Sequence, residues 1–181
     1  MKNICSHATC LAEELVLRLE QLLHDNGTPV ALIYGQWGKV SNKTYIRNGI
    51  ISPGSTVAFN IQDRDGSIIG YDEVSRLASL NNPPIQLRTG CFCNPGACQE
   101  ALSLAESDVL EQYQSGHVCG DRRGVINGKP TGAIRASFGK DSLWEDMNAL
   151  VVFIQKMFVS QGEMSLSSRM YLSSHTSSTP L

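Results

Sequence analysis

The chain has 181 residues, of which 41% are hydrophobic and 18% are charged, and its formal net charge is -2. These values allow one soluble domain with a tail and argue against a nucleic-acid binder, which usually carries a clear basic excess. No apolar run approaches the roughly 20 residues of a membrane-crossing helix, and the first residues lack the apolar stretch of a signal peptide. We therefore expect a cytoplasmic protein that binds neither nucleic acid nor membrane.

Residues 1–27 are predicted to form a linking amphipathic helix that ends at Asn26-Gly27. This helix would need another apolar surface to pack on. The residues that share its apolar face are Leu11, Leu15, Leu19, Leu22 and Leu23.

Two short strands are predicted next, over residues 29–34 and 56–61, and a turn is predicted at 63–66. A helix over 72–80 would be ended by the Asn-Asn-Pro-Pro block at 81–84. We expect the polar stretch between the two strands to be irregular because of its glycines, which are Gly35, Gly38 and Gly49.

The middle of the sequence leads into a cluster of cysteines. A strand over 85–88 would run into Gly90, just before that cluster. Asn94 followed by Pro95 resembles the cap and the first position of a helix, which we predict over 97–104.

A further helix is predicted around 108–114, followed by a strand over 133–138. The last helix would be opened by a capping box formed by Ser142 and Glu145. The serine-rich segment 161–181 is predicted to be a disordered tail. The apolar stripe of the last helix consists of Leu143, Met147, Leu150, Val151, Ile154 and Phe158.

This order of elements predicts an α/β or α+β fold in which helices cover a small sheet. Residues 28–160 would form that domain, between the N-terminal helix and the tail.

The six cysteines are unusual because three of them lie within eight residues. In a reducing compartment such a cluster is more typical of reactive or metal-binding thiols than of disulfides. The cysteines are Cys5, Cys10, Cys91, Cys93, Cys98 and Cys119.

The cluster at 91–98 allows three interpretations. Thiols that lie between a strand and a helix N-terminus, with Arg88 nearby, are placed where a thiolate is stabilised, as a nucleophile or sulfur carrier requires. Alternatively, the cysteines are small buried residues of a core. A zinc site is the third alternative, although the spacings differ from the paired C-x2-4-C knuckles of structural zinc sites. Its ligands would come from Cys91, Cys93, Cys98, Cys119 and His117.

Three motifs, in the expected order, resemble those of one enzyme family. They are RTGCFCNPGAC at 88–98, GHVCGD at 116–121 and GKPTGAIRASFG at 128–139. Together they are similar to the molybdenum cofactor sulfurases, in the cysteine desulfurase branch of the class V aminotransferase-like enzymes. The resemblance covers residues 29–158 and implies the small domain of a fold-type I pyridoxal-phosphate enzyme.

The resemblance implies a sulfurtransferase reaction. Such an enzyme binds L-cysteine on pyridoxal phosphate, takes its sulfur as a persulfide on an enzyme thiolate and releases alanine. The sulfur then passes to the molybdenum cofactor, as xanthine dehydrogenase and aldehyde oxidase require. A homodimer of the full enzyme is expected.

The resemblance also implies roles for single residues. Cys93, five residues after Arg88 in an R-x-G-x-x-C register, would carry the persulfide. Arg135 would receive the substrate carboxylate, and Arg88 would be a second active-site arginine unless it is a solvated charge at a strand end. Possible accessory residues are Cys91, Cys98 and His117, of which His117 can equally be a loop histidine with one hydrogen bond.

The chain also departs from the family pattern. No lysine has the sequence context of the cofactor-binding lysine, so we expect the chain to be a fragment without that domain and inactive alone. The alternative is an inactive cysteine-rich module, zinc-binding or regulatory, that keeps the fold. The lysines are Lys2, Lys39, Lys43, Lys129, Lys140 and Lys156.

Overall fold

The computed structural model describes residues 2–39, 53–118 and 120–159. The predicted tail at 161–181 and Gly49 lie outside these residues. The elements in the described ranges, in chain order, are α1 (Lys2–Gln21), β1 (Ala31–Ile33), α2 (Gly35–Lys39), β2 (Thr56–Gln62), β3 (Ile68–Ile69), α3 (Tyr71–Leu80), β4 (Arg88–Gly90), α4 (Pro95–Ala101), α5 (Glu106–Gln114), β5 (Val125–Ile126), β6 (Lys129–Pro130), β7 (Ala133–Ser137) and α6 (Trp144–Phe158).

The main sheet has the strand order β1-β2-β7-β4, and β3 pairs with β2 as well. Each of these pairings is antiparallel. Strands β5 and β6 form a separate antiparallel hairpin. The described chain is therefore the α+β form of the predicted fold, with a small sheet covered by helices.

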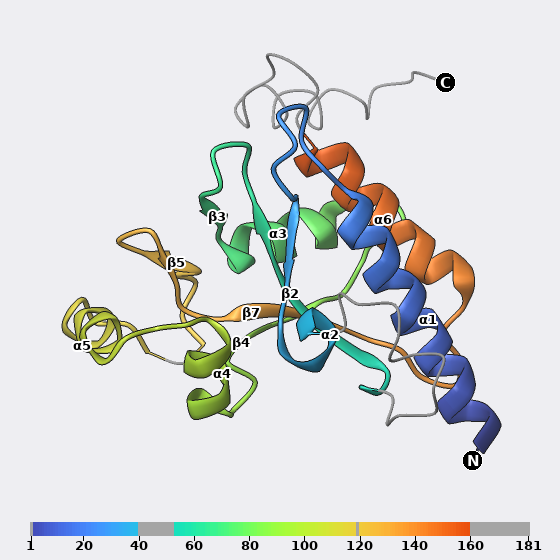
Figure 1. Cartoon of the computed structure of the whole chain (residues 1–181), viewed down its shortest axis with the longest axis horizontal. Coiled ribbons are helices and arrows are strands. Elements are labelled where there is room, and N and C mark those ends of the chain that lie inside the picture. Colours follow the sequence, from blue (N-terminus) through green and yellow to red (C-terminus); the bar gives the residue numbers. More distant parts are fainter. Residues whose placement is uncertain (1, 40–52, 119, 160–181) are drawn as a thin grey trace, which may run out of the picture.

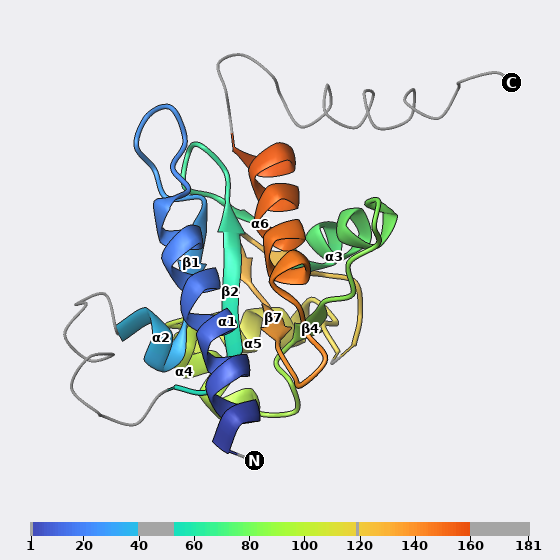
Figure 2. The same cartoon turned by 90° about the vertical axis from the view of Figure 1, so that its right-hand side faces the viewer.

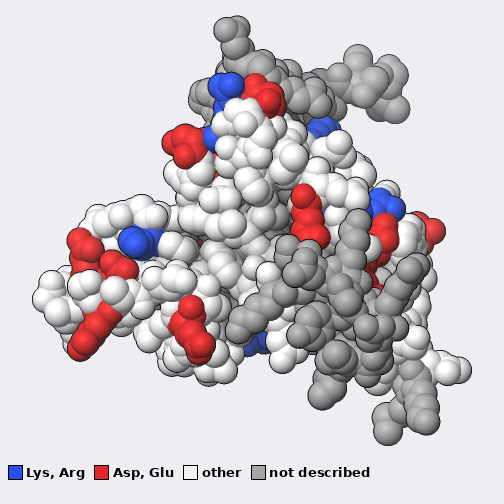
Figure 3. All heavy atoms as spheres, viewed as in Figure 1, with Lys and Arg blue, Asp and Glu red and all other residues white. Residues whose placement is uncertain are grey.

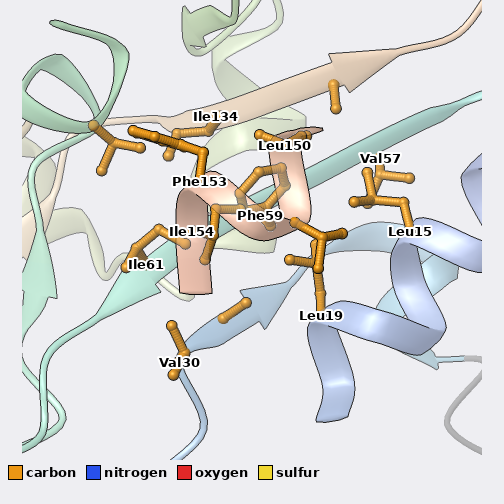
Figure 4. Close-up of a cluster of buried hydrophobic side chains, with 14 of the residues drawn as sticks. Leu15, Leu19, Val30, Val57, Phe59, Ile61, Ile134, Leu150, Phe153 and Ile154 are labelled. Carbon is orange, nitrogen blue, oxygen red and sulfur yellow. The ribbon is translucent and has the colours of Figure 1, made fainter. Parts of the chain in front are cut away.

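The side chains of β2 point alternately to the two faces of the sheet and so show how the faces differ. Val57, Phe59 and Ile61 are all 0% exposed and point into one apolar core (Figure 4). Ala58 and Asn60 point to the opposite face. One face of the sheet thus builds the core, and the other is free to carry polar groups.

Helices α1 and α6 lie side by side across the apolar face (Figures 1 and 2). Arg18 of α1 joins them, because its Nη1 donates a hydrogen bond to Oδ1 of Asn148 at 2.8 Å. Helices α4 and α5 lie away from this pair, beyond the opposite face of the sheet (Figures 1 and 2). The helical residues of the core include Leu11, Leu15 and Leu19 of α1, Val74 and Ala78 of α3, and Met147, Leu150, Ile154 and Phe158 of α6.

The stretch after β1 was predicted to be irregular, but it begins with helix α2. This helix holds Trp37, which is 3% exposed and whose Nε1 donates to the carbonyl oxygen of Thr56 at 2.9 Å. Gly38 permits the close packing, because a Cβ there would clash with the carbonyl oxygen of Ile33. The burial of the Trp37 ring therefore stabilises a short helix here, although glycines disfavour helices.

Several element boundaries differ from the prediction. The first helix, expected to end at Asn26-Gly27, is α1, which ends at Gln21. The strand expected over 85–88 is β4, which starts at Arg88, where pairing with β7 begins. The helix that Asn94 and Pro95 open is α4, which starts at Pro95 as those two residues predicted but ends at Ala101 instead of residue 104.

The predicted capping box of the last helix is also wrong. The backbone N–H of Leu143 donates to Oδ2 of Asp146 at 2.8 Å, whereas Ser142 Oγ accepts from the N–H of Gly139. Because the helix starts one residue later, Leu143 is 57% exposed instead of joining the core stripe. Leu23, which was expected on the apolar face of the first helix, lies after the end of α1 and is 47% exposed.

Among the described helices, none is long and apolar enough to cross a membrane.

Candidate functional site

The cysteine cluster forms a tight turn directly after β4. The N–H of Asn94 donates to the carbonyl oxygen of Cys91 at 3.0 Å, which closes a β-turn over 91–94. Its two central residues, Phe92 and Cys93, have φ angles of 56° and 59°, as in a type I′ turn. Non-glycine residues adopt this left-handed region at a cost of about 1–2 kcal/mol each. Such strain is concentrated at functional sites, and here it falls on Cys93, an exposed residue.

The turn leads straight into α4, as predicted. Asn94 caps the helix by accepting a hydrogen bond from the N–H of Ala97 at 3.4 Å, and Pro95 occupies the first helical position. The helix therefore anchors the C-terminal end of the turn.

The three clustered cysteines have different states. Cys91 and Cys98 form a disulfide, with their Cα atoms 5.3 Å apart. This corrects the expectation that the cluster would be reactive or metal-binding rather than cross-linked, since the first turn of α4 folds Cys98 back onto the start of the loop. Cys93 is free and exposed, as are Cys5 and Cys10 on α1.

Arg88 and Arg135 are direct neighbours, because they pair across β4 and β7. Residues paired in this way project from the same face of a sheet. The other neighbour of Arg135 is Ala58 of β2, so both arginines lie on the face opposite the core. Within the described residues neither arginine forms an ion pair. Two like charges placed together without a counter-ion favour the binding of an anion.

The Arg135 side chain connects the sheet with the turn. Its guanidinium carbon lies 5.0 Å from the centre of the Phe92 ring, a cation–π contact. Its Nε is buried and has no hydrogen-bond partner among the described residues. An unsatisfied buried donor costs about 1–3 kcal/mol, so this group is available to a ligand.

Asn60 is a further polar residue on this face, and it is not among the site residues predicted from the sequence. The side chain is 1% exposed, and its Nδ2 donates to the carbonyl oxygen of Gly132 at 3.0 Å and to the Tyr34 hydroxyl at 3.2 Å. Its Oδ1 is buried without a partner in the described part of the chain. Burial raises the pKa of Tyr34, and the hydrogen bond with Asn60 offsets this only in part. The sequence does offer a signal for this site residue, because Asn60 is a polar residue among the apolar residues of a predicted strand.

A cleft of about 1040 Å³ opens beside the turn. It is lined by four of the predicted site residues, which are Arg88, Cys91, Cys93 and His117, whereas Arg135 and Cys98 are not among the lining residues. Other charged residues of the lining are Asp72, Glu73, Arg76, Asp121 and Arg122.

The outer face of the α4–α5 arm carries acidic side chains (Figure 3). The acidic residues of α5 are Glu106, Asp108 and Glu111, of which Asp108 lies 3.7 Å from Lys129. The cleft itself is lined by both signs of charge, since Asp72, Glu73 and Asp121 accompany Arg88 and two further arginines.

His117 lies in the cleft wall and is held by a carboxylate. Its Nδ1 lies 2.9 Å from Oδ2 of Asp121. Burial acts to raise the pKa of Asp121, but hydrogen bonds from the N–H groups of Val118 and Arg123 and from His117 bring it below its ordinary value. The hydrogen bond between His117 and Asp121 is compatible with the alternative in which His117 is only a loop residue. Cys119 lies outside the described residues, which contain no group of three or more candidate metal ligands.

Compared with models of known protein families, the chain matches none. It is nevertheless 46% identical over 155 residues to a molybdenum cofactor sulfurase of Oryza sativa subsp. japonica, a match that covers 85% of this chain and 18% of that protein. The identity to a molybdenum cofactor sulfurase of Arabidopsis thaliana is 44% over 157 residues, covering 87% of the chain and 18% of the relative. The identity to a molybdenum cofactor sulfurase of Homo sapiens is 42% over 154 residues, a match that covers 85% of the chain and 16% of the relative. The chain spans less than a fifth of the length of these relatives.

Proposed function

Since 85% or more of this chain aligns with one segment of these molybdenum cofactor sulfurases, we propose that it is the sulfur-accepting lobe of such an enzyme. In this proposal Cys93 receives sulfur from L-cysteine as a persulfide, and the sulfur is later passed to the molybdenum cofactor. The activity would belong to the complete enzyme, a pyridoxal-phosphate-dependent sulfurtransferase of the cytoplasm.

The observation that supports this function best is the placement of Cys93. It is a free, exposed thiol on a strained turn and lines the same cleft as Arg88. A thiolate nucleophile needs access to its substrate and neighbouring positive charge. The attack would form an S–S bond as the carbon–sulfur bond of L-cysteine breaks, and a proton would replace sulfur on that carbon to give L-alanine.

Arg135 and Arg88 are proposed to bind the carboxylate of L-cysteine. A carboxylate matches the planar fork of a guanidinium, which donates two parallel hydrogen bonds. This role is supported by the adjacency of both cations and by the Nε of Arg135, which has no hydrogen-bond partner in the described part of the chain.

Pyridoxal phosphate would supply the electron sink that weakens the carbon–sulfur bond. The described residues do not provide its covalent anchor, because no lysine lines the cleft. Lys129 and Lys140 instead lie near Asp108 and Asp141, at 3.7 and 3.4 Å. The cofactor would therefore be held by a part of the complete enzyme outside this chain, and Cys93 would meet it across the cleft.

The persulfide assignment can be tested in a chimera that carries this chain in place of the matching segment of the Oryza sativa relative. After one turnover with L-cysteine, sulfane sulfur is trapped by alkylation and the modified peptide is mapped. We expect the persulfide on Cys93, and we expect Cys93→Ser to abolish alanine release.

Cys10→Ser is the matched control, because Cys10 is also free and exposed but lies on α1. It should release alanine as the unmodified chimera does. A persulfide mapped to Cys91, or full sulfuration activity in Cys93→Ser, would overturn the assignment.

A further inference from the structure

Three sulfur atoms are gathered at one turn, and only one of them is needed to accept a persulfide. Cys91 and Cys93 are the first and third residues of the turn, and Cys98 lies one turn into the helix that follows it. Cys91 and Cys98 are already joined to each other, whereas Cys93 is free. The pair therefore forms a two-electron couple next to the proposed sulfur carrier.

Passing sulfur onward as sulfide requires electrons. The terminal sulfur of a persulfide is at the oxidation level of elemental sulfur, so its release as sulfide takes up two electrons. A dithiol that closes to a disulfide releases two electrons.

We propose that Cys91 and Cys98, as a dithiol, discharge the Cys93 persulfide and become the disulfide seen in the structure. The Cys91 thiolate attacks Sγ of Cys93, so that an S–S bond forms between them and hydrogen sulfide leaves. Cys98 then attacks Cys91, which frees the Cys93 thiol and closes the Cys91–Cys98 bond. The sum is one persulfide and two thiols converted into one thiol, one disulfide and one sulfide. This inference rests on the proposed function of Cys93.

The contacts of the turn support a resolving role for Cys91. Its Sγ lies 3.4 Å from the carbonyl oxygen of Thr131, and the residue lines the same cleft as Cys93. Cys98 sits on a capped helix whose start is fixed by Asn94, so its distance from Cys91 is set by the fold. Thiol–disulfide exchange depends on such access. A dithiol reductant would have to restore the pair before the next turnover.

The test uses the reduced 181-residue chain, freed of reductant, and one equivalent of glutathione persulfide as the sulfur donor. Released sulfide is measured, and disulfides are located by non-reducing peptide mapping. We expect about one sulfide per chain together with a Cys91–Cys98 disulfide. Cys91→Ser should keep the persulfide on Cys93 and slow sulfide release at least tenfold. Cys98→Ser should accumulate a Cys91–Cys93 disulfide.

Cys10→Ser is the control and should behave as the unmodified chain. The inference is wrong if Cys91 and Cys98 are both recovered as free thiols after the sulfide has left. It is also wrong if Cys91→Ser releases sulfide at the unmodified rate, or if Cys93→Ser still closes the disulfide at that rate. None of these results depends on alanine release by the chimera, so a failure here is separate from a failure of the proposed function.

Discussion

At the scale of single residues, Arg135 is the group whose environment most needs a ligand. It lies mid-strand beside Arg88, its Nε has no hydrogen-bond partner among the described residues, and its guanidinium carbon lies 5.0 Å from the centre of the Phe92 ring. The guanidinium is planar, and its two-pronged donor geometry is what distinguishes arginine from lysine in binding a carboxylate.

Arg135→Lys in the chimera should therefore raise the KM for L-cysteine by about tenfold or more, even though the charge is kept, because lysine offers a point charge instead of a fork. Steady-state kinetics of alanine formation measure this. Arg64→Lys is the matched control, since Arg64 is an exposed residue of the β2–β3 turn that pairs with Asp25. An unchanged KM in Arg135→Lys would remove this residue from the carboxylate site.

At the scale of elements, the cysteine turn is held in place by close packing of β4 against the start of β7. A Cβ built on Gly132 would lie 2.7 Å from the Cα and carbonyl carbon of Gly90, which are backbone atoms that cannot rotate away. The same segment receives the hydrogen bond from Asn60 to the Gly132 carbonyl oxygen. The position of the turn thus depends on a glycine outside it.

Gly132→Ala should lower the free energy of unfolding by about 1–3 kcal/mol, the usual range for overpacking. Denaturant titration of the 181-residue chain measures the change. Gly96→Ala is the control, because a Cβ at Gly96 in α4 would meet nothing within 4 Å. That variant should be neutral or slightly stabilising. If the Gly132→Ala chain is as stable as the unmodified one, the backbone at Gly90 can shift enough to admit a methyl group, and the packing is not close enough to hold the turn.

Periodic patterns explain which elements could be predicted from the sequence. The alternation in β2 and the apolar stripes of α1 and α6 identified these elements because burial repeats along them. Strands β3, β5 and β6 have two residues each, too few for any period to be visible. The adjacency of Arg88 and Arg135 depends on strand register, and the Cys91–Cys98 bond depends on where α4 begins, so neither could be derived from spacing alone.

At the scale of the whole molecule, the sheet has one closed face and one open face. Helices α1 and α6 seal the apolar face, whereas the other face carries the arginines next to a wide cleft. A lobe of this kind would offer half of the proposed site, with an exposed thiol and cations for an anion, but with no lysine among the described residues that line the cleft.

The 181-residue chain alone should therefore form no stoichiometric Schiff base with pyridoxal phosphate. The chain is incubated with the cofactor, reduced with borohydride, and examined by intact mass and peptide mapping. Lys129 and Lys140 are involved in ion pairs, and Lys156 lies on α6, on the side of the sheet away from the cleft. A single lysine modified in nearly every chain would show the idea to be wrong, whereas the chimera should gain one adduct.

The pairing of α1 with α6 also has a consequence for how the protein is made. Leu15 and Leu19 are 0% exposed in the folded chain, yet part of their cover is α6, which is synthesised more than a hundred residues later. While the ribosome translates the interval, the N-terminal helix has no final partner and its apolar stripe stays accessible. Contacts this distant in sequence form slowly, and exposed apolar surface invites aggregation meanwhile. The apolar stripe of α1 is thus open to wrong contacts until α6 has been synthesised.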